Sequence, residues 1–206
     1  MNRSNLAEKP EYYYTVEEYL TGERQALNKH EYINGEIVAM AGATRFHNLI
    51  GTNAVIALGV QLRGRRCEIY ANDMRVRMRG ARYGYPDVVV VCGEPQFADN
   101  EFDVLLNPVI VVEVLSDSTR FRDKTEKLET YLAMESVREC LLIEQNKTRV
   151  EQYIKQTPRQ WLLRIFESAD ETIALDAIGC TLSLAEVYAQ VEFAPEESEN
   201  VNERES

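Results

Sequence analysis

The sequence predicts a single α/β (α+β) domain with a mixed central β-sheet that is flanked by helices. Two apolar runs, residues 88–91 (VVVV) and 108–115 (PVIVVEVL), consist mostly of β-branched residues. Such strands lie in the middle of a sheet and are covered on both faces. Segments with helical periodicity come before and after them. With 206 residues, 45% of them hydrophobic, the chain is long enough to form one core.

The first elements have clear local signals. Thr15 and Glu18 have the spacing of a capping box, which predicts a short helix over residues 16–20. Residues 31–39 (EYINGEIVA) contain an Asn-Gly pair between two apolar runs, a pattern that favours a hairpin turn. Apolar residues recur at helical spacing over residues 46–62, which predicts a long helix.

Alternating and continuous apolar patterns predict the remaining elements. Helices are expected at residues 121–134 and 184–191. Strands are expected at residues 67–70, 73–78, 88–91, 108–115, 139–144, 149–154, 161–166 and 171–175. The last three of these are additional C-terminal strands that follow the central ones.

Composition sets the organisation of the chain. We expect a flexible N-terminus at residues 1–12, one domain at 13–192 and a disordered acidic tail at 193–206. The 34 acidic and 23 basic residues give a net charge of −11. No apolar run approaches the ~20 residues of a membrane helix, and the N-terminus lacks a secretory signal. These features predict a cytoplasmic protein that does not enter a membrane.

Cysteine and histidine usage argues against several kinds of site. The four cysteines are widely spaced, without the close pairs of a zinc or thioredoxin-type motif. The two histidines, His30 and His47, are too few to favour a histidine-based zinc site or a serine–histidine triad. Phosphate-binding loops and dinucleotide fingerprints are absent.

Two carboxylates on the apolar strands are the main functional signal. Asp87 directly precedes VVVV, and Glu113 lies inside VIVVEVL. A carboxylate in a buried run is costly unless it is paired, hydrogen-bonded or bound to a metal. Taken alone, Glu113 fits a solvent face, a strand end or an arginine partner at least as well. If the two strands are adjacent, both acids converge on one cation, and oxygen ligands favour Mg²⁺ or Mn²⁺.

The expected helix at 121–134 adds a third element. Asp123, Lys127 and Tyr131 are spaced four residues apart and lie along one stripe. An exposed helical ion pair explains this stripe equally simply. A lysine above the strand ends would orient water or stabilise charge on a phosphate. Lys124 lies nearer the centre of the apolar face, and periodicity alone does not choose between the two lysines.

Four motifs together resemble a known family. They are the segments INGEIVAMAGATRFHNLI, PDVVVV, PVIVVEVLSDSTRFRDKTEKLETY and VRECLLIE. Their combination is similar to the Uma-type family of bacterial restriction endonucleases, which belongs to the PD-(D/E)xK nuclease superfamily. The resemblance covers residues 12 to 190. It implies a restriction-endonuclease-like core, in agreement with the predicted order of elements.

The resemblance also implies roles for individual residues. Asp87 matches the aspartate of the PD motif and Glu113 the acid of the (D/E)xK motif, so both would be metal ligands and catalytic. The lysine expected two residues later is replaced by Leu115. In this family the lysine has moved to the next helix, which selects Lys127 over Lys124.

Further positions match the family less specifically. Glu36 would be an additional metal-site acid, or else a solvent-facing acid after the turn. His47 would contact a phosphate, or else serve as a polar residue at the start of a helix. Asp123 and Tyr131 would contact Lys127 and hold it in position without touching the substrate.

These features predict a Mg²⁺-dependent (or Mn²⁺-dependent) endonuclease that hydrolyses DNA, with RNA as an alternative substrate. The arginines of the 73–78 strand and its end, Arg75, Arg77 and Arg79, would follow the DNA backbone, although a solvated strand face explains them at least as well.

Two other hypotheses are an inactive nuclease-fold protein that binds nucleic acid or protein, and a structural homodimer assembled through the C-terminal strands. A homodimer also suits the nuclease, and a partner protein would supply specificity because no recognition domain is evident.

Overall fold

The computed structural model describes residues 12–116 and 123–193 of the chain. The expected flexible N-terminus and acidic tail therefore fall outside the described residues, apart from Tyr12 and Phe193. The start of the helix expected at residues 121–134 falls outside them too.

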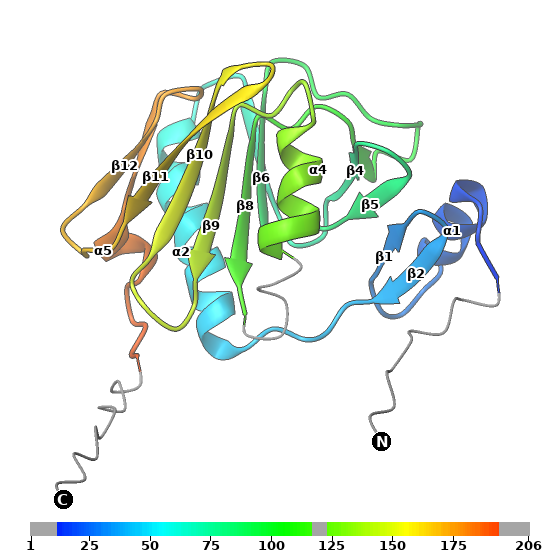
Figure 1. Ribbon diagram of the computed structural model, residues 1–206, viewed down its shortest axis with the longest axis horizontal. Coiled ribbons are helices and arrows are strands. Elements are labelled where there is room, and N and C mark those ends of the chain that lie inside the picture. The colour runs from blue at the N-terminus through cyan, green and yellow to red at the C-terminus, as the bar shows by residue number, and fades with distance from the viewer. Residues whose placement is uncertain (1–11, 117–122, 194–206) are drawn as a thin grey trace, which may run out of the picture.

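A mixed six-stranded sheet forms the centre of the molecule (Figure 1). Its order is β11-β10-β9-β8-β6-β3, in which β8 and β9 are parallel and the other neighbours are antiparallel. The strands are β3 (Cys67–Ala71), β6 (Val88–Cys92), β8 (Ile110–Leu115), β9 (Glu139–Glu144), β10 (Val150–Thr157) and β11 (Gln160–Phe166). The β-branched runs are thus its inner strands, as predicted, and β10 and β11 extend the sheet on the C-terminal side.

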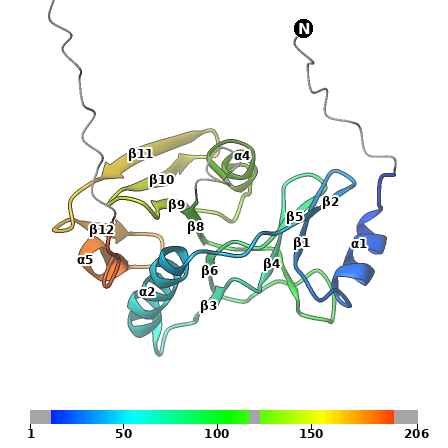
Figure 2. The same cartoon turned by 90° about the horizontal axis from the view of Figure 1, so that it is seen from below.

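Helices cover both faces of this sheet, and Figure 2 shows α2 and α4 on opposite sides of it. On one face, α2 (Arg45–Leu62) packs through Ile50 and Leu58 with α5 (Leu184–Val187) and the hairpin of β12 (Thr172–Leu175) and β13 (Cys180–Ser183). On the other face lies α4 (Leu128–Leu132), preceded by a π-helical turn at Asp123–Lys127. Burial on both faces is the reason that β6 and β8 carry few polar residues.

A second, five-stranded sheet lies beside the first, with the order β2-β1-β5-β4-β7. Its strands are β1 (His30–Ile33), β2 (Glu36–Ala39), β4 (Arg75–Met78), β5 (Arg82–Gly84) and β7 (Val104–Leu105). The helix α1 (Val16–Glu23) packs on it, and its Thr15–Glu18 capping box is formed as predicted. Asn34 and Gly35 both have positive φ, which is the turn geometry that an Asn-Gly hairpin requires. The one predicted sheet is thus accompanied by a separate sheet containing the N-terminal hairpin.

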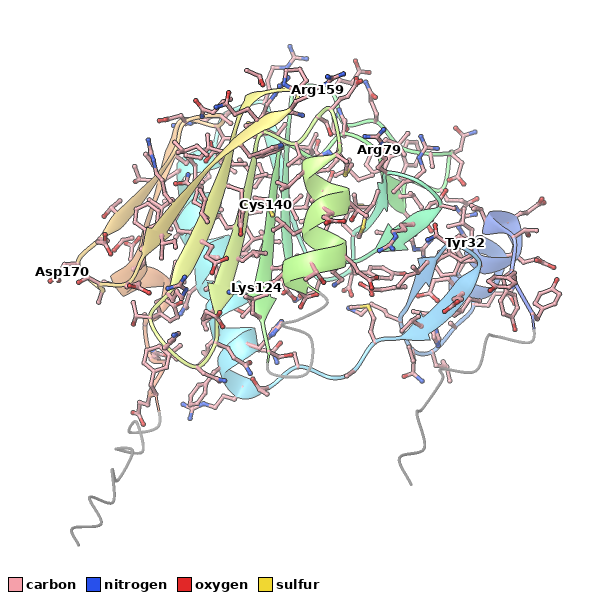
Figure 3. The ribbon with its side chains drawn as sticks, viewed as in Figure 1. Tyr32, Arg79, Lys124, Cys140, Arg159 and Asp170 are labelled. Carbon is pink, nitrogen blue, oxygen red and sulfur yellow. A yellow bond between two sulfur atoms is a disulfide. The ribbon has the colours of Figure 1, made fainter. Side chains whose placement is uncertain are left out.

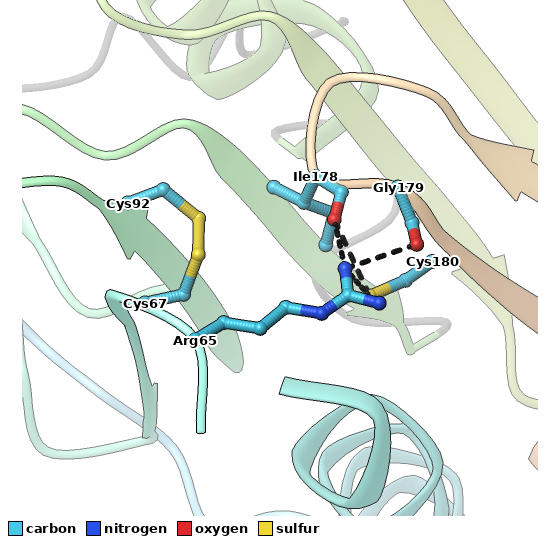
Figure 4. Close-up of a disulfide and its surroundings, with 6 residues drawn as sticks. All are labelled: Arg65, Cys67, Cys92, Ile178, Gly179 and Cys180. Atoms are coloured by element: carbon cyan, nitrogen blue, oxygen red, sulfur yellow. Dashed lines mark hydrogen bonds between the residues drawn. A yellow bond between two sulfur atoms is a disulfide. The ribbon is translucent and has the colours of Figure 1, made fainter. Parts of the chain in front are cut away.

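The spacing of the cysteines did not indicate the disulfide between Cys67 and Cys92. These two residues face each other on the antiparallel neighbours β3 and β6, and only the strand pairing brings them together. Figure 4 shows Arg65 beside this bond, where its guanidinium donates to the carbonyl oxygens of Ile178 and Gly179. This contact ties the start of β3 to the β12–β13 hairpin. Among the described residues, no helix is both long and apolar enough to span a membrane.

Candidate functional site

The register between β6 and β8 brings the two strand carboxylates together. Val88 pairs with Val112, so Asp87, which immediately precedes β6, lies opposite Glu113. The Oδ2 atom of Asp87 accepts a hydrogen bond of 2.7 Å from the backbone N–H of Val114. Glu113 is only 3% exposed. The sequence predicted a shared site only on the condition that the two strands are adjacent, and β6 and β8 are adjacent in the sheet.

His47 lies on the first turn of α2 and contacts Asp87. The Nε2 atom of its ring is 2.8 Å from Oδ1 of Asp87. The turn is held by Thr44, whose hydroxyl accepts from the backbone N–H of His47 and donates to the side chain of Gln145. Because the helix start is anchored in this way, the imidazole is fixed against the carboxylate. The structure thus places His47 beside one of the two candidate metal ligands.

Lys127 lies among three carboxylates. Its Nζ atom is 2.9 Å from Oε1 of Glu31, 3.2 Å from Oδ1 of Asp123 and 3.5 Å from Oε1 of Glu113. The hydroxyl of Tyr131 donates a 2.5 Å hydrogen bond to the same Oε1 atom of Glu113. The predicted stripe of Asp123, Lys127 and Tyr131 therefore converges on Glu113.

The neighbouring lysine points elsewhere. Figure 3 labels Lys124. Its Nζ atom is 3.1 Å from Glu144, the last residue of β9, and 2.8 Å from Glu151, near the start of β10. Lys127 is thus the lysine that faces the strand carboxylates. Periodicity left this choice open because both lysines lie within one turn of the predicted helix.

Burial and mutual charge shift the pKa values in this cluster. Burial raises the pKa of Glu113 to about 8, and Asp87 and Asp123 add to the rise while Lys127 opposes it. Burial alone would lower the pKa of Lys127, but Glu113, Glu31 and Asp123 outweigh that effect and raise it. Lys127 therefore keeps its proton at neutral pH, and Glu113 binds a proton more tightly than an exposed glutamate does.

These groups line one cavity of about 660 Å³ between the two sheets. One wall is the small-residue segment 39–44, which links β2 to α2. The polar side chains of the lining belong to Asn28, Lys29, Glu31, Thr44, His47, Asn48, Asn72, Tyr85, Asp87, Glu113, Ser116, Asp123 and Lys127. Strand ends and helix starts from distant parts of the chain thus share a single concave site, which is where ligand sites are usually found.

Sequence reasoning missed Glu31 and selected Glu36 in its place. Both acids belong to the β1–β2 hairpin, but Glu31 is buried beside Lys127 whereas Glu36 is exposed at the turn end and does not line the cavity. The prediction that Glu36 is a metal-site acid is not supported by this placement. The sequence shows only an acid at the second position of a short strand, and the burial of Glu31 became evident only in the structure.

Of the three arginines proposed for the DNA backbone, Arg75 needs correction, whereas the proposed contacts of Arg77 and Arg79 stay predictions. Arg75 is only 4% exposed, and its guanidinium donates to the hydroxyl of Tyr85 and pairs with Asp103. It therefore connects elements of the second sheet and does not line the cavity. Arg77 and Arg79 are exposed, but neither lines the cavity. The alternating pattern of β4 therefore did not show that Arg75, on the same face as the exposed Arg77, is buried.

The donor set suits a hard divalent cation. Among the described residues no group of three or more His, Cys, Asp or Glu side chains could hold a metal by itself. Mg²⁺, however, commonly binds to one or two carboxylates and completes its shell with water and substrate phosphates. Asp87 and Glu113 offer such a pair, so the residues present fit Mg²⁺ or Mn²⁺.

A protein-family model described as "Putative restriction endonuclease" (Uma2) matches residues 16–185. The chain belongs to the Uma2 family. The family resemblance of the sequence motifs is thereby confirmed, and with it membership of a nuclease family.

Two relatives and one solved structure are similar to this chain. Two Synechocystis proteins named as uncharacterized are related: sll1609 is 42% identical over 72% of this chain and 85% of its own length, and slr1290 is 30% identical over 86% and 92%. A crystal structure from Anabaena variabilis, described as a putative nuclease belonging to DUF820, has a TM-score of 0.68 at 17% identity. It covers 86% of this chain and 99% of that one. The likeness shows a shared fold, a nuclease-like mixed sheet flanked by helices.

Proposed function

We propose that this Uma2 protein is a Mg²⁺-dependent endonuclease that hydrolyses phosphodiester bonds of DNA. One observation carries the proposal. Asp87 and Glu113 lie side by side on neighbouring strands, and the ammonium of Lys127 is 3.5 Å from Glu113 in the same cavity. Two oxygen ligands beside a fixed cation are what hydrolysis of a phosphodiester needs.

Asp87 and Glu113 would hold the metal, with Mn²⁺ as the alternative ion. When bound, the metal polarises the phosphate and lowers the pKa of a coordinated water. Lys127 remains protonated because three carboxylates surround it, and it donates to a phosphate oxygen or orients the attacking water. Its position thus supplies positive charge where negative charge develops.

The supporting residues act through these three groups. His47 and the N–H of Val114 fix the two oxygens of Asp87, while Tyr131 fixes one oxygen of Glu113. Hydrogen bonds of this kind orient metal ligands and tune their affinity. Glu31 and Asp123 hold the ammonium of Lys127 at its place.

The geometry also supports the proposal in spite of Leu115, which occupies the position expected for the lysine. Glu113 and Leu115 are two residues apart on β8, so their side chains lie on the same face of the sheet. That face is covered by α4, and Leu115 packs there with Tyr131. Lys127, from the turn before α4, reaches Glu113 on this same face. In the proposed function, Lys127 from this turn takes the role of the lysine that is expected at position 115 of the strand.

The test is cleavage of plasmid and single-stranded DNA in Mg²⁺, Mn²⁺ or EDTA. Asp87→Ala and Lys127→Ala should each lose at least about 100-fold in rate, because each removes a group acting on the reacting phosphate. Lys124→Ala is the matched control, since it removes a lysine of the same turn that faces other partners. Absence of cleavage by the wild-type protein, or metal-independent cleavage that survives in both variants, would refute the proposal.

A further inference from the structure

Lys29 provides a second cation in the cavity, apart from the Lys127 cluster. It immediately precedes β1, and its backbone carbonyl accepts from the N–H of Met40, so the residue is held at the base of the hairpin. Its Nζ atom donates to the carbonyl oxygen of Asn72 at 3.0 Å and is 3.0 Å from Oδ1 of Asp73. The ammonium also lies 5.5 Å from the centre of the Tyr85 ring.

Asn72 bridges the Lys29 side chain and the backbone of Asp87. The N–H of Asn72 donates to the carbonyl oxygen of Asp87 at 3.0 Å, while the carbonyl oxygen of Asn72 accepts from Lys29. One residue therefore links the Lys29 ammonium to the candidate metal ligand. Asn72 has φ +55, a left-handed conformation that asparagine tolerates better than most residues. All three residues line the same cavity.

The ion partner of Lys29 is easily exchanged. The Asp73 side chain is 88% exposed and that of Lys29 is 40% exposed, and pairs of this kind contribute little to stability. Lys127, in contrast, is buried among three carboxylates. Among the described lysines and arginines that line the cavity, Lys29 is thus the one whose ammonium group can leave a solvent-exposed acid and bind a ligand.

We propose that Lys29 binds the phosphate next to the cleaved one in the same nucleic-acid strand. This inference rests on the proposed nuclease function and adds a substrate subsite to it. In this arrangement Asp87 would hold the metal at the cleaved phosphate, and Lys29, which Asn72 connects to Asp87, would bind the adjacent phosphate. Lys29 is a substrate-binding residue in this arrangement, and Asp73 competes with the phosphate for its ammonium.

Single-turnover cleavage of a short single-stranded DNA in Mg²⁺, at several salt concentrations, tests the subsite. It yields the maximal rate and the enzyme concentration for half-maximal rate, K½. Lys29→Gln should raise K½ about tenfold through loss of a charge-assisted hydrogen bond. It should also make the slope of log K½ against log salt shallower by about 0.7, the value of one phosphate contact on a single strand. Lys29→Arg keeps the charge and should keep most of the slope.

A second variant gives the opposite sign and is safe for folding. Asp73→Asn removes the exposed competitor and should lower K½ about threefold by releasing Lys29 from an exposed ion pair. In a Lys29→Gln background it should have no such effect. Arg159→Gln and Asp170→Asn are matched controls on exposed parts of the chain that do not line the cavity (labelled in Figure 3).

The outcomes separate this inference from the function on which it rests. If the wild-type protein does not cleave, the proposed function fails and the subsite, which rests on it, is refuted with it. If it cleaves, and Lys29→Gln changes K½ and the salt slope no more than Arg159→Gln does, the subsite is wrong although the function stands. If Asp73→Asn acts equally in the presence and absence of Lys29, its effect is one of net charge, and the competition is refuted.

Discussion

Replacing Glu113 by glutamine should stabilise the protein while abolishing its proposed activity. Glu113 is buried, and its pKa is raised from an ordinary 4.5 to about 8. The folded state therefore holds a proton that the unfolded chain releases between these two values. Folding stability falls as the pH rises through this window, by about 1.4 kcal/mol for each pH unit. Glutamine does not ionise, so the variant escapes this loss.

The size of the effect follows from the same two pKa values. With wild type as the reference, Glu113→Gln should be more stable by about 1 kcal/mol at pH 5, about 3 kcal/mol at pH 7 and about 5 kcal/mol at pH 9. For a chain of this length, the value at pH 7 corresponds to a rise in Tm of roughly 6–12 °C. The amide retains an acceptor for the Tyr131 hydroxyl, so the local packing is preserved.

Urea unfolding in EDTA at the three pH values measures these differences. Glu129→Gln is the control, because it removes one exposed acid from α4 and should change stability by no more than about 0.5 kcal/mol. A Glu113→Gln variant that is destabilised at all three pH values would show that the ionised carboxylate stabilises the fold, and a difference that does not grow with pH would show that folding does not raise the pKa of Glu113. The burial argument would then be wrong.

Three further predictions concern other contacts of the site and fold. Glu31→Gln should lower the maximal cleavage rate about tenfold because Lys127 loses its nearest carboxylate. In a Lys127→Ala background the same substitution should cause no further loss of rate, and an additive loss would exclude action through Lys127. His47→Ala should weaken Mg²⁺ binding measured by calorimetry about tenfold, since Asp87 loses the group that orients it, and unaltered affinity would contradict this role. Arg75→Met should cost about 3 kcal/mol in urea unfolding because Tyr85 and Asp103 lose a buried partner, with cleavage per folded molecule retained; a loss of cleavage at full stability would restore a functional role for Arg75.

Local sequence patterns predicted the elements well because their causes are local. The Thr15–Glu18 capping box and the Asn-Gly turn involve residues a few positions apart, and both formed as expected. The apolar runs also became inner strands, since the side chains on both faces had to be buried. The helix expected at 121–134 contains a π-helical turn before α4. The sequence did not predict this turn because side-chain spacing alone does not distinguish the two helix types.

Sequence reasoning chose Asp87, Glu113 and the stripe containing Lys127, and the family motifs supported the choice. Periodicity could not separate Lys127 from Lys124, and it offered Glu36 where the structure places Glu31. These failures share a cause. A helical or strand pattern states which residues lie on one face, but not which groups from another element lie opposite.

By itself, the sequence determined most of the strands, the main helices, the family and the presence of two acids in apolar surroundings, but it missed the short strands β5, β7 and β13. The tertiary structure alone decided that Asp87 and Glu113 are neighbours, and that Glu31 belongs with Lys127. It also decided that Cys67 and Cys92 pair. Secondary structure follows from interactions between residues close in the chain. The site and the disulfide depend on strand register and on packing between segments far apart in sequence, which only the folded chain specifies.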